Sequence, residues 1–258
     1  MTIARIFFPR KLEVGDCFAL TGEEQKYVTA VLRLRRDAHI LLFDGTGCEY
    51  EAVILGQDHG SVQLEVVAKT TIQKNTLHIT LAQSLPKAKK MDFIIEKACE
   101  LGTARIIPFS SLRSVPHITP DKTAPKQLRW QKIAREAARK CHSGSIPEVT
   151  SILTWEEMLR SAEVKAEKII FWEEETRRTL KQVLRTGPPE TNRTFFLVVG
   201  PEGGFAREEI EFAASHGFTS VSLGRQILKV ETAALAILAM IQYERGGFDL
   251  AVPEEDGL

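Results

Sequence analysis

The chain has 258 residues, 43% of them hydrophobic and 26% charged, and a formal net charge of zero at pH 7. A chain of this length and composition can bury one large core or two modest ones, and zero net charge argues against bulk electrostatic capture of nucleic acid. The longest apolar run, Ala233–Ile241, is too short to span a bilayer, and the first residues lack a signal-peptide pattern, so we expect no membrane contact.

The first seventy residues have a β pattern. Short runs rich in β-branched and aromatic residues predict strands at Phe18–Leu20, Ile40–Phe43, Tyr50–Leu55 and Val62–Val67. Asp44-Gly45 is a hairpin turn signal, and Glu23–Arg33 predicts one helix. We expect a small β-barrel over residues 1–72, with a polar linker at Lys69–Thr76.

From Leu77 onward strands alternate with helices. The predicted strands are Leu77–Gln83, Arg105–Pro108, Glu148–Ile152, Ile169–Trp172, Thr194–Val199 and Thr219–Leu223. The predicted helices are about Met91–Leu101, Pro125–His142, Trp155–Ala162, Thr176–Arg185, Arg207–His216 and Glu231–Arg245. This alternation predicts an α/β domain over residues 73–250, with a mostly parallel sheet covered on both faces. Residues 251–258 are acidic and predict a flexible tail.

Two glycine-bearing turns each follow a predicted strand and lead into a helix. The first is Gly200–Gly204, and the second runs from Leu223 to Thr232. Turns of this kind can hold a small ligand at the carboxyl ends of parallel strands. Glycine also serves turn geometry alone, and neither turn has dinucleotide-binding or P-loop spacing. The residues therefore leave open a ligand site and plain strand-to-helix turns.

Neither a metal site nor a disulfide framework is predicted. Cys17, Cys48, Cys99 and Cys141 form no CxxC pair, which suits reduced thiols and a cytoplasmic protein. No pair among His117, His142 and His216 has metal-ligand spacing.

Basic residues form three clusters in this neutral chain. They are Arg33-Arg35-Arg36, Lys87-Lys89-Lys90, and the segment Lys122–Lys140, which has seven basic residues and one acid. A solvated basic helix face explains the last cluster as well as a nucleic-acid contact does. Three separate clusters favour a phosphate-facing surface.

The two turns, in this order, closely resemble the SPOUT superfamily of S-adenosylmethionine-dependent RNA methyltransferases. Within it, the chain resembles the RsmE-type branch, which methylates N3 of a uridine in small-subunit (16S) ribosomal RNA. The residues outside the turns that share this resemblance are Arg5, Val31-Leu32-Arg33, Phe43-Asp44-Gly45, Lys90-Met91, Lys97, Glu100-Leu101-Gly102, Arg113, Arg129-Trp130, Glu136-Ala137-Ala138 and Ile146-Pro147-Glu148.

The resemblance implies an RNA-binding PUA-like β-barrel, an α/β domain with a trefoil knot, a homodimer, and S-adenosylmethionine bound in the knot. The implied cofactor-binding residues are Leu197, Val199, Gly200, Pro201, Glu202, Gly203, Gly204, Leu223, Gly224, Ile227, Leu228 and Thr232. The expected RNA-binding residues are Arg5, Arg33, Lys90, Arg113, Arg129, Lys132, Arg139 and Lys140. Glu231 is the expected proton acceptor, and Lys229 is expected to stabilise negative charge on a uracil oxygen.

The chain departs from the family pattern on the substrate side. Tyr27 replaces a usual histidine, Lys140–Ser143 replaces a Gln-x-x-Arg segment, and Gln226 and Lys229 replace arginines. Losing guanidinium donors changes how phosphate or a uracil edge is recognised. Two alternatives therefore remain: a non-catalytic RNA-binding or ribosome-assembly protein that keeps the fold, and a nucleotide-dependent α/β enzyme unrelated to methylation.

Overall fold

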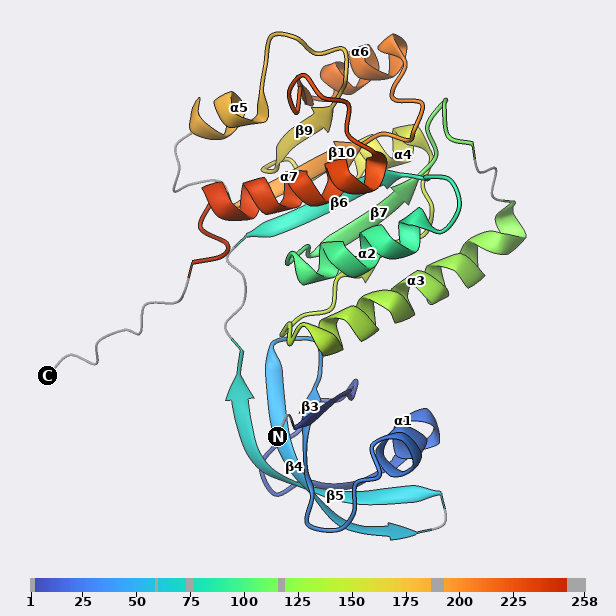
Figure 1. Cartoon of the computed structure of the whole chain (residues 1–258), viewed down its shortest axis with the longest axis vertical. Helices are drawn as coiled ribbons and strands as arrows, with labels where there is room; N and C mark the ends of the chain where they lie inside the picture. Colours follow the sequence, from blue (N-terminus) through green and yellow to red (C-terminus); the bar gives the residue numbers. More distant parts are fainter. Residues whose placement is uncertain (1–2, 59, 73–76, 116–118, 187–192, 250–258) are drawn as a thin grey trace, which may run out of the picture. The chain divides into compact units, whose positions relative to one another are not determined.

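The structure is a computed structural model that describes residues 3–58, 60–72, 77–115, 119–186 and 193–249 (Figure 1). The described residues form two compact units. The first contains those of Met1–Lys74 and Arg135–Ile146, and the second contains those of Asn75–Ala134 and Pro147–Leu258. The long helix α3 (Pro120–Lys140) therefore contributes its last turns to the first unit. The predicted tail at 251–258 lies outside the described residues.

The first unit is built on a five-stranded sheet with the strand order β1-β3-β4-β5-β2. Its strands are β1 (Ala4–Phe7), β2 (Cys17–Thr21), β3 (His39–Phe43), β4 (Cys48–Asp58) and β5 (Ser61–Thr71). A short helix α1 (Gly22–Lys26) continues into a π-helical turn at Tyr27–Val31. Alternate strand residues are buried, among them Ile40, Leu42, Val62 and Leu64, so one face of the sheet forms the core.

The four strands predicted in this part of the sequence are confirmed, with longer bounds. Strand β1 was not predicted because its parallel pairing with β3 joins segments far apart in the chain, which no local pattern signals. The predicted linker begins too early, since Lys69, Thr70 and Thr71 still pair with β4.

Arg5 is buried in this unit and is only 3% exposed. Its Nε donates to Glu49 at 2.6 Å, and its terminal nitrogens donate to the carbonyl oxygens of Ala138 at 2.7 Å and Ser143 at 2.8 Å. Its guanidinium also lies 3.8 Å from the centre of the Phe43 ring. The two carbonyls flank the end of α3, where backbone acceptors lack helical partners and a cation is favoured. Arg5 therefore fixes this helix end, which corrects its predicted role in binding phosphate.

The second unit has a six-stranded, all-parallel sheet with the order β11-β9-β10-β6-β7-β8. Its strands are β6 (His78–Ser84), β7 (Arg105–Phe109), β8 (Glu148–Val149), β9 (Glu167–Phe171), β10 (Thr194–Val199) and β11 (Thr219–Val221). Its other helices are α2 (Lys90–Glu100), α4 (Trp155–Arg160), α5 (Leu180–Thr186), α6 (Arg207–Ser215) and α7 (Val230–Glu244). The predicted α/β class with an N-terminal β unit is confirmed, whereas the trefoil knot stays a prediction.

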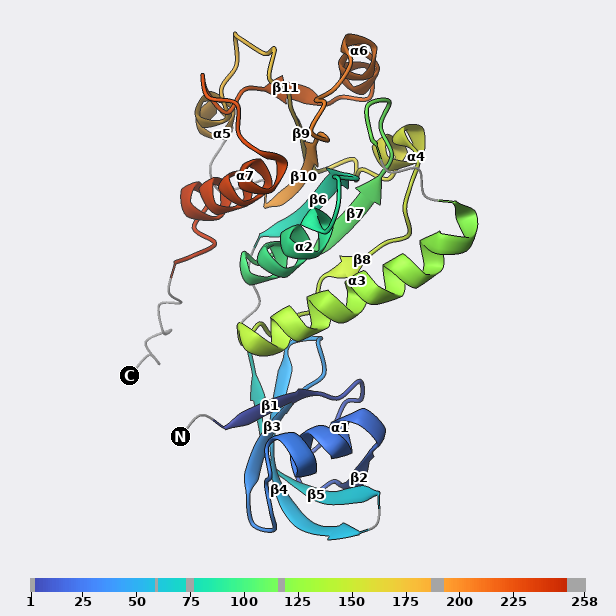
Figure 2. The same cartoon turned by 45° about the vertical axis from the view of Figure 1, so that its right-hand side comes forward.

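Helices cover both faces of this sheet. Phe196 and Val198 of β10 join a core cluster with residues of α4 and α6 on one face. On the other face α2 and α7 lie side by side (Figures 1 and 2). Within the described ranges, no helix is long and apolar enough to cross a membrane.

Two helix starts differ from those predicted. Helix α3 begins at Pro120, so Pro125 lies inside it instead of at its start. Helix α5 begins at Leu180 instead of Thr176, because Thr179 caps it: the Thr179 hydroxyl accepts from the Gln182 amide, and the Gln182 side chain accepts from the Thr179 amide.

Arg5→Met is expected to lower the free energy of unfolding by about 3 kcal/mol, because it leaves the Glu49 carboxylate and two carbonyls without their partner. Urea unfolding followed by circular dichroism measures the change. The control Arg36→Met removes an exposed guanidinium that has no ion pair in the described part of the chain, and should change stability by less than about 0.5 kcal/mol. Equal stability of the two variants would contradict the role assigned to Arg5.

Candidate functional site

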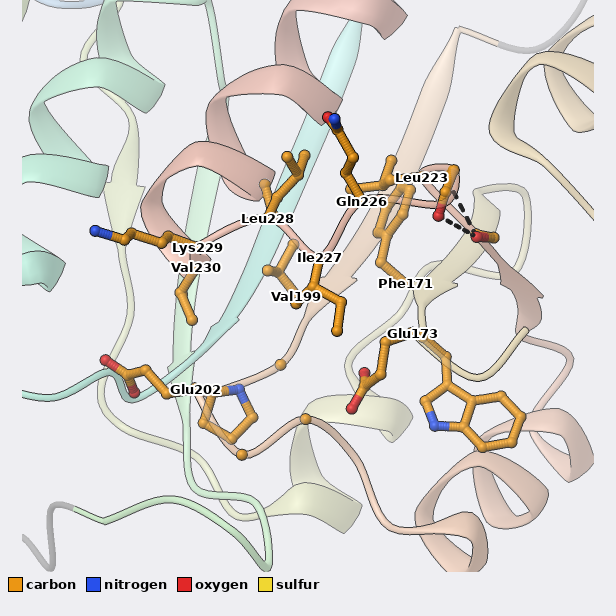
Figure 3. A pocket seen from close by; sticks show the side chains of 18 of the residues that line it. Phe171, Glu173, Val199, Glu202, Leu223, Gln226, Ile227, Leu228, Lys229 and Val230 are labelled. Carbon is orange, nitrogen blue, oxygen red and sulfur yellow. Dashed lines mark hydrogen bonds between the residues drawn. The ribbon is translucent and has the colours of Figure 1, made fainter. Parts of the chain in front are cut away.

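A pocket of about 460 Å³ opens in the second unit, where the segments after β9, β10 and β11 meet the start of α7 (Figure 3). Its lining residues are Lys90, Phe171, Trp172, Glu173, Val199, Gly200, Pro201, Glu202, Gly203, Gly204, Ser222, Leu223, Gly224, Arg225, Gln226, Ile227, Leu228, Lys229, Val230 and Ala233. Both glycine-bearing turns thus line one cavity. This volume lies within the range of small-ligand sites.

The first turn depends on Gly204. Its φ is +66°, in the left-handed region, and a Cβ added there would lie 1.7 Å from the Glu173 carboxylate. The left-handed φ is strained for residues with a side chain, and an added Cβ would also push the Glu173 carboxylate aside. Gly204 therefore lets the carboxylate of Glu173, from the segment after β9, lie directly against the turn after β10.

The second turn gives the pocket an apolar wall and an accessible backbone. Leu228 lies near Val199 and Val230 in the middle of the pocket (Figure 3). Ile227 is 88% exposed at its rim, where its apolar side chain is accessible to a ligand. Gly224 has a φ of +115° and no atom near its Cβ position, so a ligand can approach its backbone closely.

Lys90 lies between two carboxylates at one end of the pocket. Its Nζ is 2.8 Å from an oxygen of Glu202 in the first turn, and 3.3 Å from an oxygen of Glu231 in the first turn of α7. Glu202 also accepts from the backbone amide of Lys87. This Lys90–Glu202–Glu231 cluster ties the start of α2 to both turns. This Glu231 oxygen accepts no hydrogen bond from the described residues, so its contact with Lys90 is an ion pair.

The cluster shifts the titration of all three groups. Burial alone raises the pKa of Glu202, but hydrogen bonds from Lys90 and from backbone amides outweigh burial and leave it lowered. The hydrogen bond from its own backbone amide lowers the pKa of Glu231, with Lys90 adding to the effect against burial. The hydrogen bond to Glu202 raises the pKa of Lys90. All three groups are therefore charged at neutral pH, and the cluster carries a net charge of −1.

Two further contacts brace the first turn. The Arg113 guanidinium donates to the Gly203 carbonyl at 3.0 Å. The buried Glu209 carboxylate accepts from the amides of Leu112 and Ala206, both at 2.9 Å, which joins the loop after β7 to the start of α6. The backbone of the turn is thus held from the ends of β6 and β7 as well as β10.

Comparisons with known proteins identify the family. A model of an RNA methyltransferase domain matches residues 73–242, and a model of an RNA methyltransferase PUA domain matches residues 20–67. The chain belongs to this RNA methyltransferase family. The family predicted from the sequence is therefore confirmed.

Relatives match along almost the whole chain. Ribosomal RNA small subunit methyltransferase E of Rickettsia conorii is 30% identical, over 94% of this chain and 96% of its own length. The protein of the same name from Bacillus subtilis is 28% identical, over 91% and 93%. The crystal structure of the Neisseria gonorrhoeae protein of that name, bound to S-adenosyl methionine, has a TM-score of 0.84 at 30% identity and covers 94% of this chain and 98% of its own. A putative methyltransferase from Legionella pneumophila, in complex with the same cofactor, has a TM-score of 0.84 at 29% identity, with the same coverage.

Most residues predicted to bind the methyltransferase cofactor line the pocket. The exceptions are Leu197, which is buried within β10, and Thr232, which is exposed on α7. The lining residues outside the two turns to which the sequence assigned no role are Phe171, Trp172, Glu173, Ser222 and Ala233. Phe171 is the last residue of β9, and Trp172 and Glu173 follow it. Because β9 pairs in parallel with β10, the two strands end at the same edge, and that pairing is the signal that could have found these three residues. Of the two predicted catalytic residues, Lys229 lines the pocket, and Glu231 adjoins it through Lys90.

The residues predicted to bind RNA differ in their surroundings within each unit. Lys90 lines the pocket, and Arg113 donates to the Gly203 carbonyl of the first turn, as described above. Arg129 pairs with Asp92, which also accepts from the Trp130 indole. In the first unit Arg139 pairs with Glu136 and donates to the Tyr27 hydroxyl at 3.1 Å. Arg33, Lys132 and Lys140 have exposed side chains, as a phosphate contact requires.

Lys90→Met is expected to loosen the pocket without unfolding the protein, because it removes the cation between two carboxylates. Hydrogen exchange of the amides of Lys87 and Gly200–Gly204 should speed up about tenfold, since local opening is no longer opposed by the ion pairs. Lys89→Met removes an exposed neighbouring charge and should leave exchange unchanged. Unchanged exchange in Lys90→Met would show that the cluster does not hold the turn.

The same ion pairs predict a pH dependence. Carboxyl groups with a lowered pKa stabilise the folded state above the ordinary value of 4.5, and this stabilisation is lost as the pH falls through the lowered values. Lys90 has a raised pKa, so its contribution is lost as the pH rises beyond 10.5. The stability difference between wild type and Lys90→Met, from urea unfolding, should therefore be constant from about pH 5 to 9 and shrink on both sides. A difference that persists unchanged at pH 3 would exclude the ion pairs as its source.

Proposed function

We propose that this methyltransferase transfers a methyl group from S-adenosylmethionine to N3 of a uridine in small-subunit (16S) ribosomal RNA. The observation that supports this most is that the two turns line one pocket, in a chain that is similar to two proteins solved with that cofactor bound. We also propose, from the family resemblance alone, that the chain acts in the cytoplasm as a homodimer with a knotted domain.

The pocket fits this cofactor in its chemistry. Val199 and Leu228 in the middle of the pocket, with Ile227 at its rim, form an apolar surface that suits an adenine ring. The open backbone beside Gly224 can offer the ring polar contacts. Charged groups lie at opposite ends: Glu202 and Lys229 extend to one side, and Glu173 lies on the other, beneath Ile227 (Figure 3). A ligand with an aromatic ring and charged substituents matches this arrangement.

When bound, S-adenosylmethionine supplies a methyl group on a positively charged sulfur, which is already strongly electrophilic. The tasks left for the protein are to align the reactants, exclude water and accept the proton that leaves the uracil imide nitrogen. The N3–H becomes strongly acidic as the new N–C bond forms, so even a weakly basic carboxylate suffices as acceptor.

Glu231 is the proposed proton acceptor. Its lowered pKa makes it a weak base that is fully ionised at neutral pH. Lys229, an exposed residue at the N-cap of α7, is proposed to stabilise negative charge on a uracil oxygen.

The test of the reaction is a comparison of ribosomal RNA from cells with and without this protein. Nucleoside mass spectrometry of 16S RNA should show one N3-methyluridine lost without the protein, and restored by the wild-type chain. Titration calorimetry with S-adenosylmethionine complements it. Cofactor binding with an unchanged methylation map would favour a non-catalytic RNA-binding or ribosome-assembly role. Failure to bind the cofactor would favour an enzyme of another kind.

Glu231→Gln is expected to lower the turnover number by about 10²- to 10⁴-fold, as for loss of a general base, with a much smaller effect on cofactor affinity. Initial rates of methylation of small subunits, measured with isotopically labelled cofactor, provide the readout. In the wild type the rate should fall as the pH drops below 4.5, where Glu231 begins to protonate. Glu211→Gln, an exposed carboxylate on α6, is the control. Full activity of Glu231→Gln would remove Glu231 from the chemistry.

A further inference from the structure

Glu173 differs from the two acidic residues that follow it. Glu174 lies 3.7 Å from the Arg207 guanidinium, and Glu175 accepts from the Ser220 hydroxyl at 2.5 Å. Glu173 has neither an ion pair nor a hydrogen bond within the described ranges, and it is the one of the three that lines the pocket. The structure thus leaves the carboxylate at the ligand site without a counter-ion.

The first turn is shaped to accommodate that carboxylate. A Cβ at position 204 would overlap the Glu173 oxygens, as described above, so glycine at this position leaves room for the carboxylate beside the turn. Figure 3 shows Glu173 between Ile227 and the turn, on the side away from Glu202 and Lys229. The Lys90–Glu202–Glu231 cluster, with its own cation, is therefore not what balances Glu173.

The other cations that line the pocket do not balance Glu173 either. Lys90 is engaged by two carboxylates. Arg225 and Lys229 are exposed, and neither lies within ion-pairing distance of Glu173 in the described structure. A carboxylate in a concave site partly walled by apolar side chains lowers the free energy of a cationic ligand more than that of a neutral one.

We propose that Glu173 is a specificity-determining residue that makes this pocket prefer the positively charged sulfonium cofactor to the neutral thioether product. The inference rests on the proposed function. The two ligands have the same adenosine and amino-acid parts and differ by one methyl group and one positive charge at sulfur. A negative charge in the pocket is thus the simplest means of distinguishing the two ligands. Because the carboxylate attracts the neutral product less than the charged cofactor, it favours release of the product after each turnover.

The experiment is titration calorimetry of the full chain with S-adenosylmethionine and with S-adenosylhomocysteine. Wild type should bind the charged ligand more tightly. Because Glu173 is exposed, the effect is moderate: Glu173→Gln should reduce the ratio of the two affinities by roughly three- to tenfold, through weaker binding of the charged ligand. Raising the salt concentration should narrow the wild-type ratio and leave the variant's ratio nearly unchanged.

Two variants act as controls. Glu174→Gln removes a neighbouring charge that is already paired with Arg207, and should keep the wild-type ratio. Glu173→Asp keeps the charge and should keep part of the preference. An unchanged melting temperature of Glu173→Gln shows that the fold is intact.

Two results would overturn the proposal. An equal loss of affinity for both ligands would mean that Glu173 contacts a part that the two ligands share, such as the ribose hydroxyls or the ammonium group. No loss for either would mean that the carboxylate does not act on the ligand. If folded wild-type protein binds neither ligand, the proposed function itself fails. If the wild type binds both ligands with equal affinity, only the role proposed for Glu173 fails.

Discussion

The parallel pairing of β10 with β6 is the constraint on which the site depends. Six residues of β10, from Thr194 to Val199, pair in register with His78–Gln83, so these two strands end at the same edge. The chain fills one half of the sheet with β6, β7 and β8, and then returns to the other side of β6 with β10, β9 and β11. A crevice at the carboxyl ends of the strands, where the order reverses, is a general property of such sheets. The first glycine turn leaves β10 at this place.

Electrostatics then divides the pocket into two ends. At one end Lys90 neutralises part of the charge of two carboxylates and joins the loop after β6 to both turns. At the other end Glu173 remains unbalanced in the described chain. The apolar side chains between the two ends reduce screening by water, so each charge acts more strongly on a bound ligand than it would at an open surface. Charges that brace the pocket and charges available to a ligand are thus kept apart.

The basic residues illustrate why charge patterns in a sequence do not reveal function directly. Arg5, Lys90 and Arg113 all resembled phosphate contacts. In the structure Arg5 fixes a helix end, Lys90 bridges carboxylates, and Arg113 braces a glycine turn. A cation stabilises buried carbonyls and carboxylates by the same interactions with which it binds phosphate, so its role depends on which acceptors the fold brings within reach. That arrangement joins residues ninety or more positions apart.

The sequence alone determined the α/β alternation, the β-rich first part, the two turns and the family, because these depend on local periodicity and on residue types at fixed spacing. Even the strand Thr194–Val199 was predicted with its observed bounds. Only the tertiary structure decided that β9 contributes Glu173, that Lys90 belongs to the pocket, and that β1 pairs with β3. Such contacts depend on strand order and on side chains meeting across loops, and no local pattern encodes them. The two glycine turns could be located along the chain, but their meeting in one pocket follows from the packing of the parallel sheet.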